Sequence, residues 1–210
     1  FSVDVKGYSS GSASIFLNYA NDSAEATSVD TDTHFPLSEG PFSNTASYSG
    51  HTGIFIRLVS ATTMEIGVYT FDETNTHWDS YAGKIAATVT VPSLDSFQTI
   101  NVKDDNQGKI TIAVAGTVVA TIKYSNDGVY NNFDTKTWGN FSERYYKTAT
   151  ITDYNNGGVV ASTDKALIAK YKTVGFGTRA CDLHIDNYQI IPAKAVTEPA
   201  VKYPDVITVE

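Results

Sequence analysis

The sequence contains little of what disulfide-bonded, helical or membrane-spanning proteins need. It has one cysteine, Cys181, together with one methionine and six leucines among 210 residues. A single cysteine excludes a disulfide within the chain, which is unusual for secreted animal domains but common in secreted bacterial ones. The shortage of Leu and Met argues against a helix bundle. No apolar run approaches the roughly 18 residues of a membrane-spanning helix, so membrane insertion is not expected.

Positive charge is also scarce. Fifteen Lys and Arg residues stand against 23 Asp and Glu residues, so the net charge is -8, and only three of the basic residues are arginine. Nucleic-acid binding draws much of its affinity from a basic surface that neutralises phosphates. The composition therefore argues against a nucleic-acid partner and leaves neutral polar ligands and cationic partners open.

β-Branched residues dominate instead. The chain has 19 Val, 15 Ile and 26 Thr residues, and such side chains fit the pleated surface of a sheet. Alternating apolar runs bounded by Gly, Asp, Asn and Ser predict strands at residues 12–19, 53–59, 63–71 and 85–91. The pattern predicts an all-β fold.

The clearest unit spans residues 97–124. Three alternating runs follow one another there, and the last two are joined by a tight turn at Ala115-Gly116. This arrangement is typical of a three-stranded antiparallel meander. Farther along, residues 171–180 and 183–191 alternate in the same way and predict a final hairpin.

Two segments lack this alternation. Residues 21–49 are polar and acidic, whereas residues 125–164 form a longer, aromatic-rich stretch. A loop as long as the second usually has a function or contains small strands of its own. Residues 165–171 fit one short helical turn or strand. We expect a single sandwich domain over residues 1–192, with 193–210 as a tail or linker toward a neighbouring domain.

Three stretches resemble a known superfamily. They are FSNTASYSGHTGIFIRL at 42–58, FQTINVKDDNQGKITIAVAGTVVATIKY at 97–124 and YKTVGFGTRACDLHIDNYQI at 171–190. Their strand and turn pattern resembles that of the concanavalin A-like (laminin-G-like) superfamily. The resemblance covers about 150 residues and implies an antiparallel jelly-roll sandwich of two sheets, one of them concave. That superfamily includes lectins, carbohydrate-binding modules and retaining β-glucanases, so the fold alone does not choose a function.

Catalytic patterns are missing from the sequence. The glucanase branch carries a Glu-x-Asp-x-x-Glu strand, because retaining hydrolysis needs two carboxyl groups about 5 Å apart. The nearest approach has Glu65 alone on its strand, with Asp72 and Glu73 at the strand end. The histidines lack zinc-site spacing. We therefore expect no enzymatic activity from this domain.

A structural Ca²⁺ ion is an expectation of the resemblance alone. Related sandwiches often bind calcium with an Asp of the final strand, and Asp186 matches that position. Calcium takes six to eight oxygen ligands. The alternative is that Asp186 accepts a backbone hydrogen bond at a strand end, without any metal.

Aromatic residues in polar surroundings are candidate sugar platforms, because sugars present apolar C–H faces and hydroxyl groups. Trp78 lies between polar residues, with Asp79 and Tyr81 close by. Trp138 is a second candidate, with Tyr146 as a shared wall. The alternative is that these rings pack their loops onto the sheet.

Two arginines complete the predicted binding set. Arg57 alternates with Ile54, Ile56 and Leu58 and is expected on the outward face, and Arg179 is placed likewise. A guanidinium group there could bind carboxylates or vicinal hydroxyls. The alternative is an arginine that is solvated or ion-paired within its own sheet.

Together these features favour a non-catalytic carbohydrate-binding, lectin-like domain of a larger secreted or cell-surface bacterial protein. Its partner would be an oligo- or polysaccharide, and tethering to a catalytic domain would raise the local substrate concentration. Two alternatives stay open. A protein-binding adhesin or structural sandwich would show an exposed apolar patch, and a glycoside hydrolase or lyase would need two facing carboxylates.

Overall fold

The structure, a computed structural model, describes residues 1–9, 13–19, 52–70, 83–128, 145–170, 172–178 and 181–191. Within these ranges every regular element is a β-strand, and the strands pair in antiparallel fashion. The all-β prediction is confirmed. Over the same ranges, no helix has the length and apolarity to cross a membrane. The tail predicted at 193–210 lies outside the described residues.

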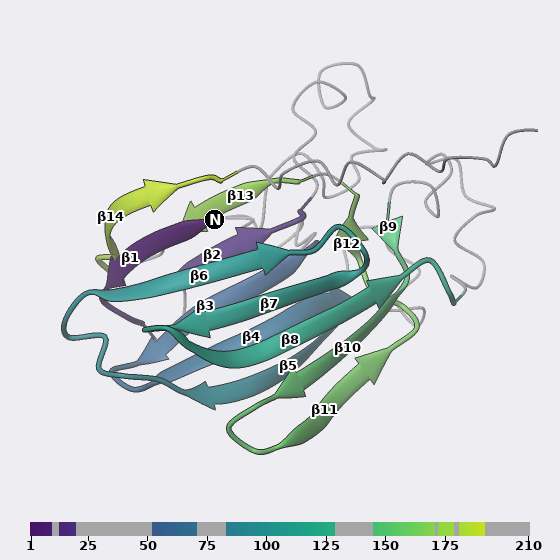
Figure 1. Ribbon diagram of the computed structural model, residues 1–210, viewed down its shortest axis with the longest axis horizontal. Helices are drawn as coiled ribbons and strands as arrows, with labels where there is room; N and C mark the ends of the chain where they lie inside the picture. Colours follow the sequence, from purple (N-terminus) through teal and green to yellow (C-terminus); the bar gives the residue numbers. More distant parts are fainter. Residues whose placement is uncertain are drawn as a thin grey trace, which may run out of the picture.

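Seven strands form the larger sheet, in the order β11-β10-β8-β7-β6-β1-β14 (Figure 1). These strands are β1 (Ser2–Lys6), β6 (Gln98–Asp104), β7 (Lys109–Val114), β8 (Thr117–Ser125), β10 (Thr148–Asp153), β11 (Gly158–Thr163) and β14 (His184–Gln189).

Five strands form the second sheet, in the order β13-β2-β3-β4-β5. These strands are β2 (Ser14–Leu17), β3 (Ile54–Ser60), β4 (Thr63–Thr70), β5 (Gly83–Thr90) and β13 (Val174–Gly177). A small third sheet pairs β9 (Tyr145–Tyr146) with β12 (Ile168–Ala169).

The two larger sheets stack face to face around one apolar core (Figure 1). Ile110 and Ile122 of the larger sheet, and Ile56 and Ile66 of the second, are at most 1% exposed. Burial of such side chains is the main favourable term in folding, at about 25 cal/mol per Å² of apolar surface. The core therefore fixes which face of each strand points inward.

The predicted faces of β3 are confirmed on the core side. Ile54, Ile56 and Leu58 are fully buried in the core. On the opposite face Arg57 is partly exposed, but Phe55 is only 2% exposed and lies outside the core cluster. Phe55 is buried because its ring lies over Gly67, which faces it across the β3–β4 pair.

The predicted meander is confirmed as β6, β7 and β8. Ala115 and Gly116 join the last two strands with φ values of 48° and 81°. Two successive positive φ angles define the type I′ turn, whose twist matches that of the strands it joins. Directly after the turn, the register of β8 shifts by one residue at a β-bulge.

The predicted final hairpin is wrong. β13 pairs with β2 in the five-stranded sheet, whereas β14 pairs with β1 in the seven-stranded sheet. The chain therefore crosses from one sheet to the other between residues 177 and 184, and Cys181 lies on this crossover. Alternation reports which residues of a strand share a face but not which strand is its partner, since pairing depends on distant segments.

Residues 125–164 contain the small strands that their length suggested. β10 and β11 pair across a turn after Asp153, and β9 lies just before them. Asp153 is 1% exposed and accepts hydrogen bonds from the backbone N–H groups of Asn155 and Asn156. Residues 165–171 include the two-residue strand β12, so the short-strand alternative holds there and the helical one does not.

The packing of Phe55 on Gly67 predicts a large effect of one added methyl group. A Cβ atom at Gly67 would meet the Phe55 ring and lie 2.6 Å from the carbonyl oxygen of Ile85. We expect Gly67→Ala to lower the free energy of unfolding by about 1–3 kcal/mol through overpacking. Gly158→Ala is the matched control, because nothing lies within 4 Å of a Cβ there. Urea denaturation that gives equal stability for the two variants would contradict this packing.

Candidate functional site

The outward face of the seven-stranded sheet is lined by hydroxyl and ammonium groups. Two rows of side chains cross β7, β8 and β10 there, because their residues are register partners. The rows are Lys109, Lys123 and Thr150, and then Thr111, Thr121 and Thr152. The intervening Ile110, Ile122 and Ile151 are at most 1% exposed and point into the core, so their neighbours lie on the opposite face, where Thr121 is only 4% exposed.

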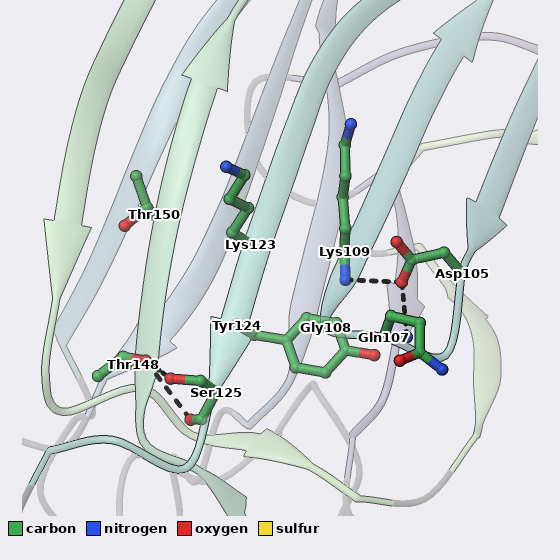
Figure 2. A pocket seen from close by; sticks show the side chains of 9 residues that line it. All are labelled: Asp105, Gln107, Gly108, Lys109, Lys123, Tyr124, Ser125, Thr148 and Thr150. Atoms are coloured by element: carbon green, nitrogen blue, oxygen red, sulfur yellow. Dashed lines mark hydrogen bonds between the residues drawn. The ribbon is translucent and has the colours of Figure 1, made fainter.

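A shallow, open hollow of about 500 Å³ lies where the lysine row meets the β6–β7 loop (Figure 2). Its lining residues are Asp105, Gln107, Gly108, Lys109, Lys123, Tyr124, Ser125, Thr148 and Thr150. Lys109 and Lys123 extend from neighbouring strands toward the same side of the hollow (Figure 2). The Ser125 and Thr148 hydroxyls lie 2.5 Å apart at its other side.

Asp105 shapes the rim through the loop between β6 and β7. Its Oδ1 accepts hydrogen bonds from the backbone N–H groups of Gln107, at 2.7 Å, and Lys109, at 2.9 Å. Partial burial raises the pKa of Asp105, but these two N–H groups and the Lys109 charge outweigh it and hold the pKa below its ordinary value. The carboxylate is therefore ionised and engaged with the loop backbone.

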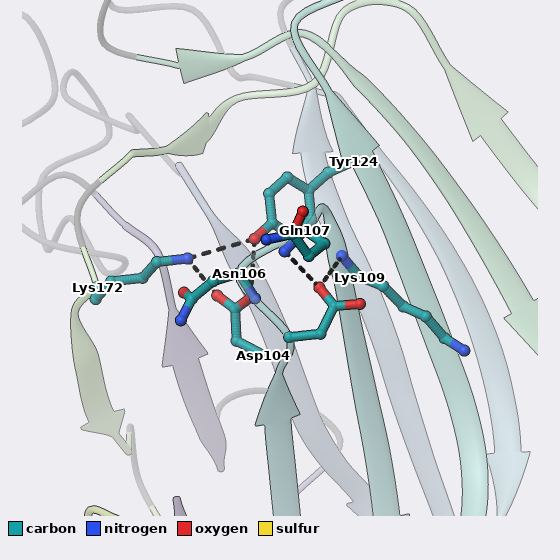
Figure 3. Close-up of polar contacts among 7 residues, drawn as sticks. Asp104, Asn106, Gln107, Lys109, Tyr124 and Lys172 are labelled. Atoms are coloured by element: carbon teal, nitrogen blue, oxygen red, sulfur yellow. Dashed lines mark hydrogen bonds and ion pairs between the residues drawn. The ribbon is translucent and has the colours of Figure 1, made fainter. Parts of the chain in front are cut away.

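A second polar cluster anchors the same loop from the core side (Figure 3). The Tyr124 hydroxyl donates to Asp104 Oδ1 at 3.0 Å, and Lys172 Nζ forms an ion pair with the same carboxylate. Burial, followed by the nearby Asp104 charge, raises the pKa of Tyr124 well above its usual value, so its hydroxyl stays a donor. Since Lys172 leads into β13, this cluster joins the two large sheets beside the hollow.

Tyr146, one of the predicted sugar contacts, lies behind this wall. Its ring centroid is 4.5 Å from that of Tyr124, and Lys170 Nζ lies 5.7 Å from the Tyr146 ring. Tyr146 is not among the lining residues of the hollow. Its ring packs against Tyr124, in agreement with the alternative that the ring has a packing role and does not contact sugar.

Arg57 lies on the outward face of the other sheet, as the alternation predicts. Its guanidinium forms an ion pair with Glu65, its direct neighbour across the β3–β4 pair. Lys84 Nζ donates to the same carboxylate at 2.6 Å. The structure therefore brings Arg57 into an ion-paired cluster within its own sheet and not to the hollow.

Asp186 lies on β14 opposite Asp4 of β1. Its Oδ1 accepts the backbone N–H of Asn187 at 2.8 Å, while Asp4 accepts hydrogen bonds from Thr99 and Asn187. These two hydrogen bonds lower the pKa of Asp4. No group of three or more acidic, His or Cys side chains converges anywhere in the described chain. The described donors alone fall short of the six to eight oxygens of a calcium site, and calcium at Asp186 stays a prediction.

The other predicted contacts lie outside the described residues. They are Trp78, Asp79, Tyr81, Trp138 and Arg179. Sequence reasoning missed Lys109, Lys123 and Thr150. In a hairpin without a bulge, the Ala115-Gly116 turn would pair Lys109 with Ile122. The bulge adds one residue to β8, so Lys109 pairs with Lys123. Alternation of Thr with Ala and Ile over β10 is the signal that could have revealed Thr150.

The hydrogen bonds of Asp105 predict a pH-dependent stability. Its unfolded pKa is near 3.8 and its folded pKa is lower. Its contribution is therefore complete above the unfolded value and is lost as the pH falls through the folded value. Because Asp105 is exposed and solvent screens its charge, we expect Asp105→Ala to lower the free energy of unfolding by only about 0.5 kcal/mol at neutral pH and by less at about pH 2. Urea denaturation at both pH values measures this.

Gln107→Ala is the control, because it keeps the backbone N–H that donates to Asp105. It should change stability little at either pH. A deficit in Asp105→Ala that is equally large at both pH values would contradict the role given to the ionised carboxylate.

No similarity to known proteins bears on the hollow or on the sheet face around it. Comparison of the chain with protein-family models, with curated proteins and with solved structures finds no match. The side chains of the hollow therefore provide the chemical indication of what it binds.

Proposed function

We propose that this chain is a non-catalytic carbohydrate-binding, lectin-like domain that binds glycan on the outward face of its seven-stranded sheet. The single observation that carries the proposal is the hollow on the seven-stranded sheet, whose lining includes hydroxyl and ammonium groups. Sugar recognition needs polar groups that the scaffold holds in place. Strands β7, β8 and β10 hold these groups, since the alternate residues of each strand are fixed in the core.

The carboxylates near the two outward faces favour binding over hydrolysis. Glycoside hydrolysis needs two carboxyl groups flanking the bond, about 5–10 Å apart. The described lining of the hollow includes one, Asp105, and backbone N–H groups engage its Oδ1. Glu65, the other candidate acid with a described position, is ion-paired with both Arg57 and Lys84. An ion-paired carboxylate is a poor proton donor at neutral pH.

The proposal extends to the topology and the setting of the domain. Two stacked antiparallel sheets are compatible with the jelly roll of the concanavalin A-like superfamily. We place the domain in a larger secreted or cell-surface bacterial protein, where tethering to a catalytic domain would raise the local glycan concentration. Trp78 and Trp138, the predicted sugar platforms, belong to this proposal as predictions and lie outside the described residues.

Removing one hydroxyl from the hollow tests the proposal. We expect the wild-type protein to bind at least one member of a polysaccharide panel, and Thr150→Val to weaken that binding about fivefold through loss of one hydrogen bond. Thr88→Val is the matched control, because Thr88 is exposed on β5 of the other sheet. Isothermal titration calorimetry would measure the affinities. Retention of full affinity by Thr150→Val, with a loss in Thr88→Val, would place the site on the other sheet.

One observation favours a second candidate function, protein binding. The edge strands β13 and β14 carry a cluster of exposed apolar side chains, and the Phe176 and Tyr188 rings pack edge to face at 5.5 Å. Tyr188 is 42% exposed and Ile190 is 63% exposed. An exposed edge strand with apolar side chains is a template for pairing with a strand of another chain.

Self-association gives a direct test of this second candidate. If the edge recruits another chain, sedimentation velocity should show a concentration-dependent dimer of the wild-type protein. The double variant Tyr188→Ser and Ile190→Ser should remain monomeric, because its edge offers less apolar surface. A wild-type protein that stays monomeric at the highest concentrations, with the variant indistinguishable from it, would count against edge pairing.

A further inference from the structure

Lys109 and Lys123 place two positive charges side by side. They are direct register partners on β7 and β8, and like charges that face each other across two strands destabilise the pair. The ion pairs of the described chain involve Arg57, Lys84 and Lys172 but neither of these two lysines. The hollow thus contains a local positive charge that no described side chain neutralises by an ion pair.

The hollow also lacks a stacking platform among its described lining. Tyr124 is its one aromatic residue, but it is 6% exposed, and its hydroxyl is bound to Asp104. Among the described residues, the groups that can bind a ligand in the hollow are therefore hydrogen-bonding and charged groups and not an exposed ring. A neutral sugar would use the hydroxyls and leave both ammonium groups unpaired.

We infer that the hollow binds an acidic polysaccharide whose carboxylate or sulfate groups lie between the Lys109 and Lys123 ammonium groups. Hydroxyls of Thr148 and Thr150 then bind the sugar hydroxyls on the β10 side. This inference rests on the proposed glycan-binding function and names its ligand class. Lysine is a flexible point charge that suits either anion, whereas arginine would select planar, bidentate partners.

The net charge of -8 does not prevent this binding. At physiological ionic strength the Debye length is about 8 Å, so distant carboxylates are largely screened. The carboxylate nearby, Asp105, directs its Oδ1 to backbone N–H groups of its own loop. Asp104, on the core side of that loop, is neutralised by Lys172. The charged residues of the described lining are Lys109, Lys123 and the single carboxylate Asp105, so that lining keeps a positive balance although the whole chain is acidic.

Matched ligands and matched variants test the inference. The ligands are dextran sulfate against dextran, and polygalacturonate against its methyl ester, so that each pair differs only in its anionic groups. The variants are Lys109→Gln, Lys123→Gln and the control Lys84→Gln. The control makes the same charge change on the other sheet, where the ammonium pairs with Glu65 at 2.6 Å.

We expect binding to at least one anionic ligand and weaker or no binding to its neutral match, with affinity falling as NaCl is added. Lys109→Gln and Lys123→Gln should each weaken binding about fivefold, and Lys84→Gln should leave it unchanged. The melting temperatures of the two site variants should stay close to that of the wild type, because each removes a like-charge contact, which at Lys109 is offset by the lost attraction to Asp105. Loss of binding through misfolding would instead lower them.

Three results would overturn the inference. Equal losses in all three variants would mean a diffuse charge effect and not a site. Equal binding of neutral and anionic ligands, unchanged in the lysine variants, would overturn the acidic ligand class while leaving the proposed function in place. Failure of every polysaccharide to bind would overturn the proposed function, and this inference with it.

Discussion

The burial of alternate side chains between two stacked sheets is the constraint on which the rest of this structure depends. Ile110, Ile122 and Ile151 are held in the core, and that placement alone directs Lys109, Lys123 and Thr150 outward. A slip of one residue in register would exchange the two sets and expose the isoleucines. The energy that stabilises the fold therefore also orients the binding face.

The outward faces of the two large sheets differ in whether their charged side chains form ion pairs with each other. On the five-stranded sheet Arg57 and Lys84 share the Glu65 carboxylate, so that face is neutralised within itself. On the seven-stranded sheet the facing lysines are left without such a partner in the described structure. Glu65 is only 13% exposed and serves both cations, so the first arrangement satisfies its charges within the sheet. The second leaves a charge that a ligand can neutralise, which is the physical basis for assigning function to that face.

Local features of the sequence were sufficient for much of the fold. Strands β3 and β4 follow from the alternation of their core residues, and the Ala115-Gly116 pair between two alternating runs predicts the turn, in which both residues have positive φ angles. The pairing and register of strands that are distant in the sequence could not be predicted from local patterns. β13 and β14 pair with different sheets although they follow each other in the sequence, and β10 alternates Thr with Ala and Ile, which is a weak apolar signal. The lysine pair depends on a one-residue bulge that no local pattern marks.

The central claim is that the lysine-lined hollow of the seven-stranded sheet binds acidic glycan. Its most direct test is to titrate a ¹⁵N-labelled protein with a short oligogalacturonide and follow the amide chemical shifts by NMR. Perturbations should cluster at Gln107, Lys109, Lys123 and Thr150, which surround the hollow. Perturbations centred on Arg57 and Glu65, or none at millimolar ligand, would contradict the claim.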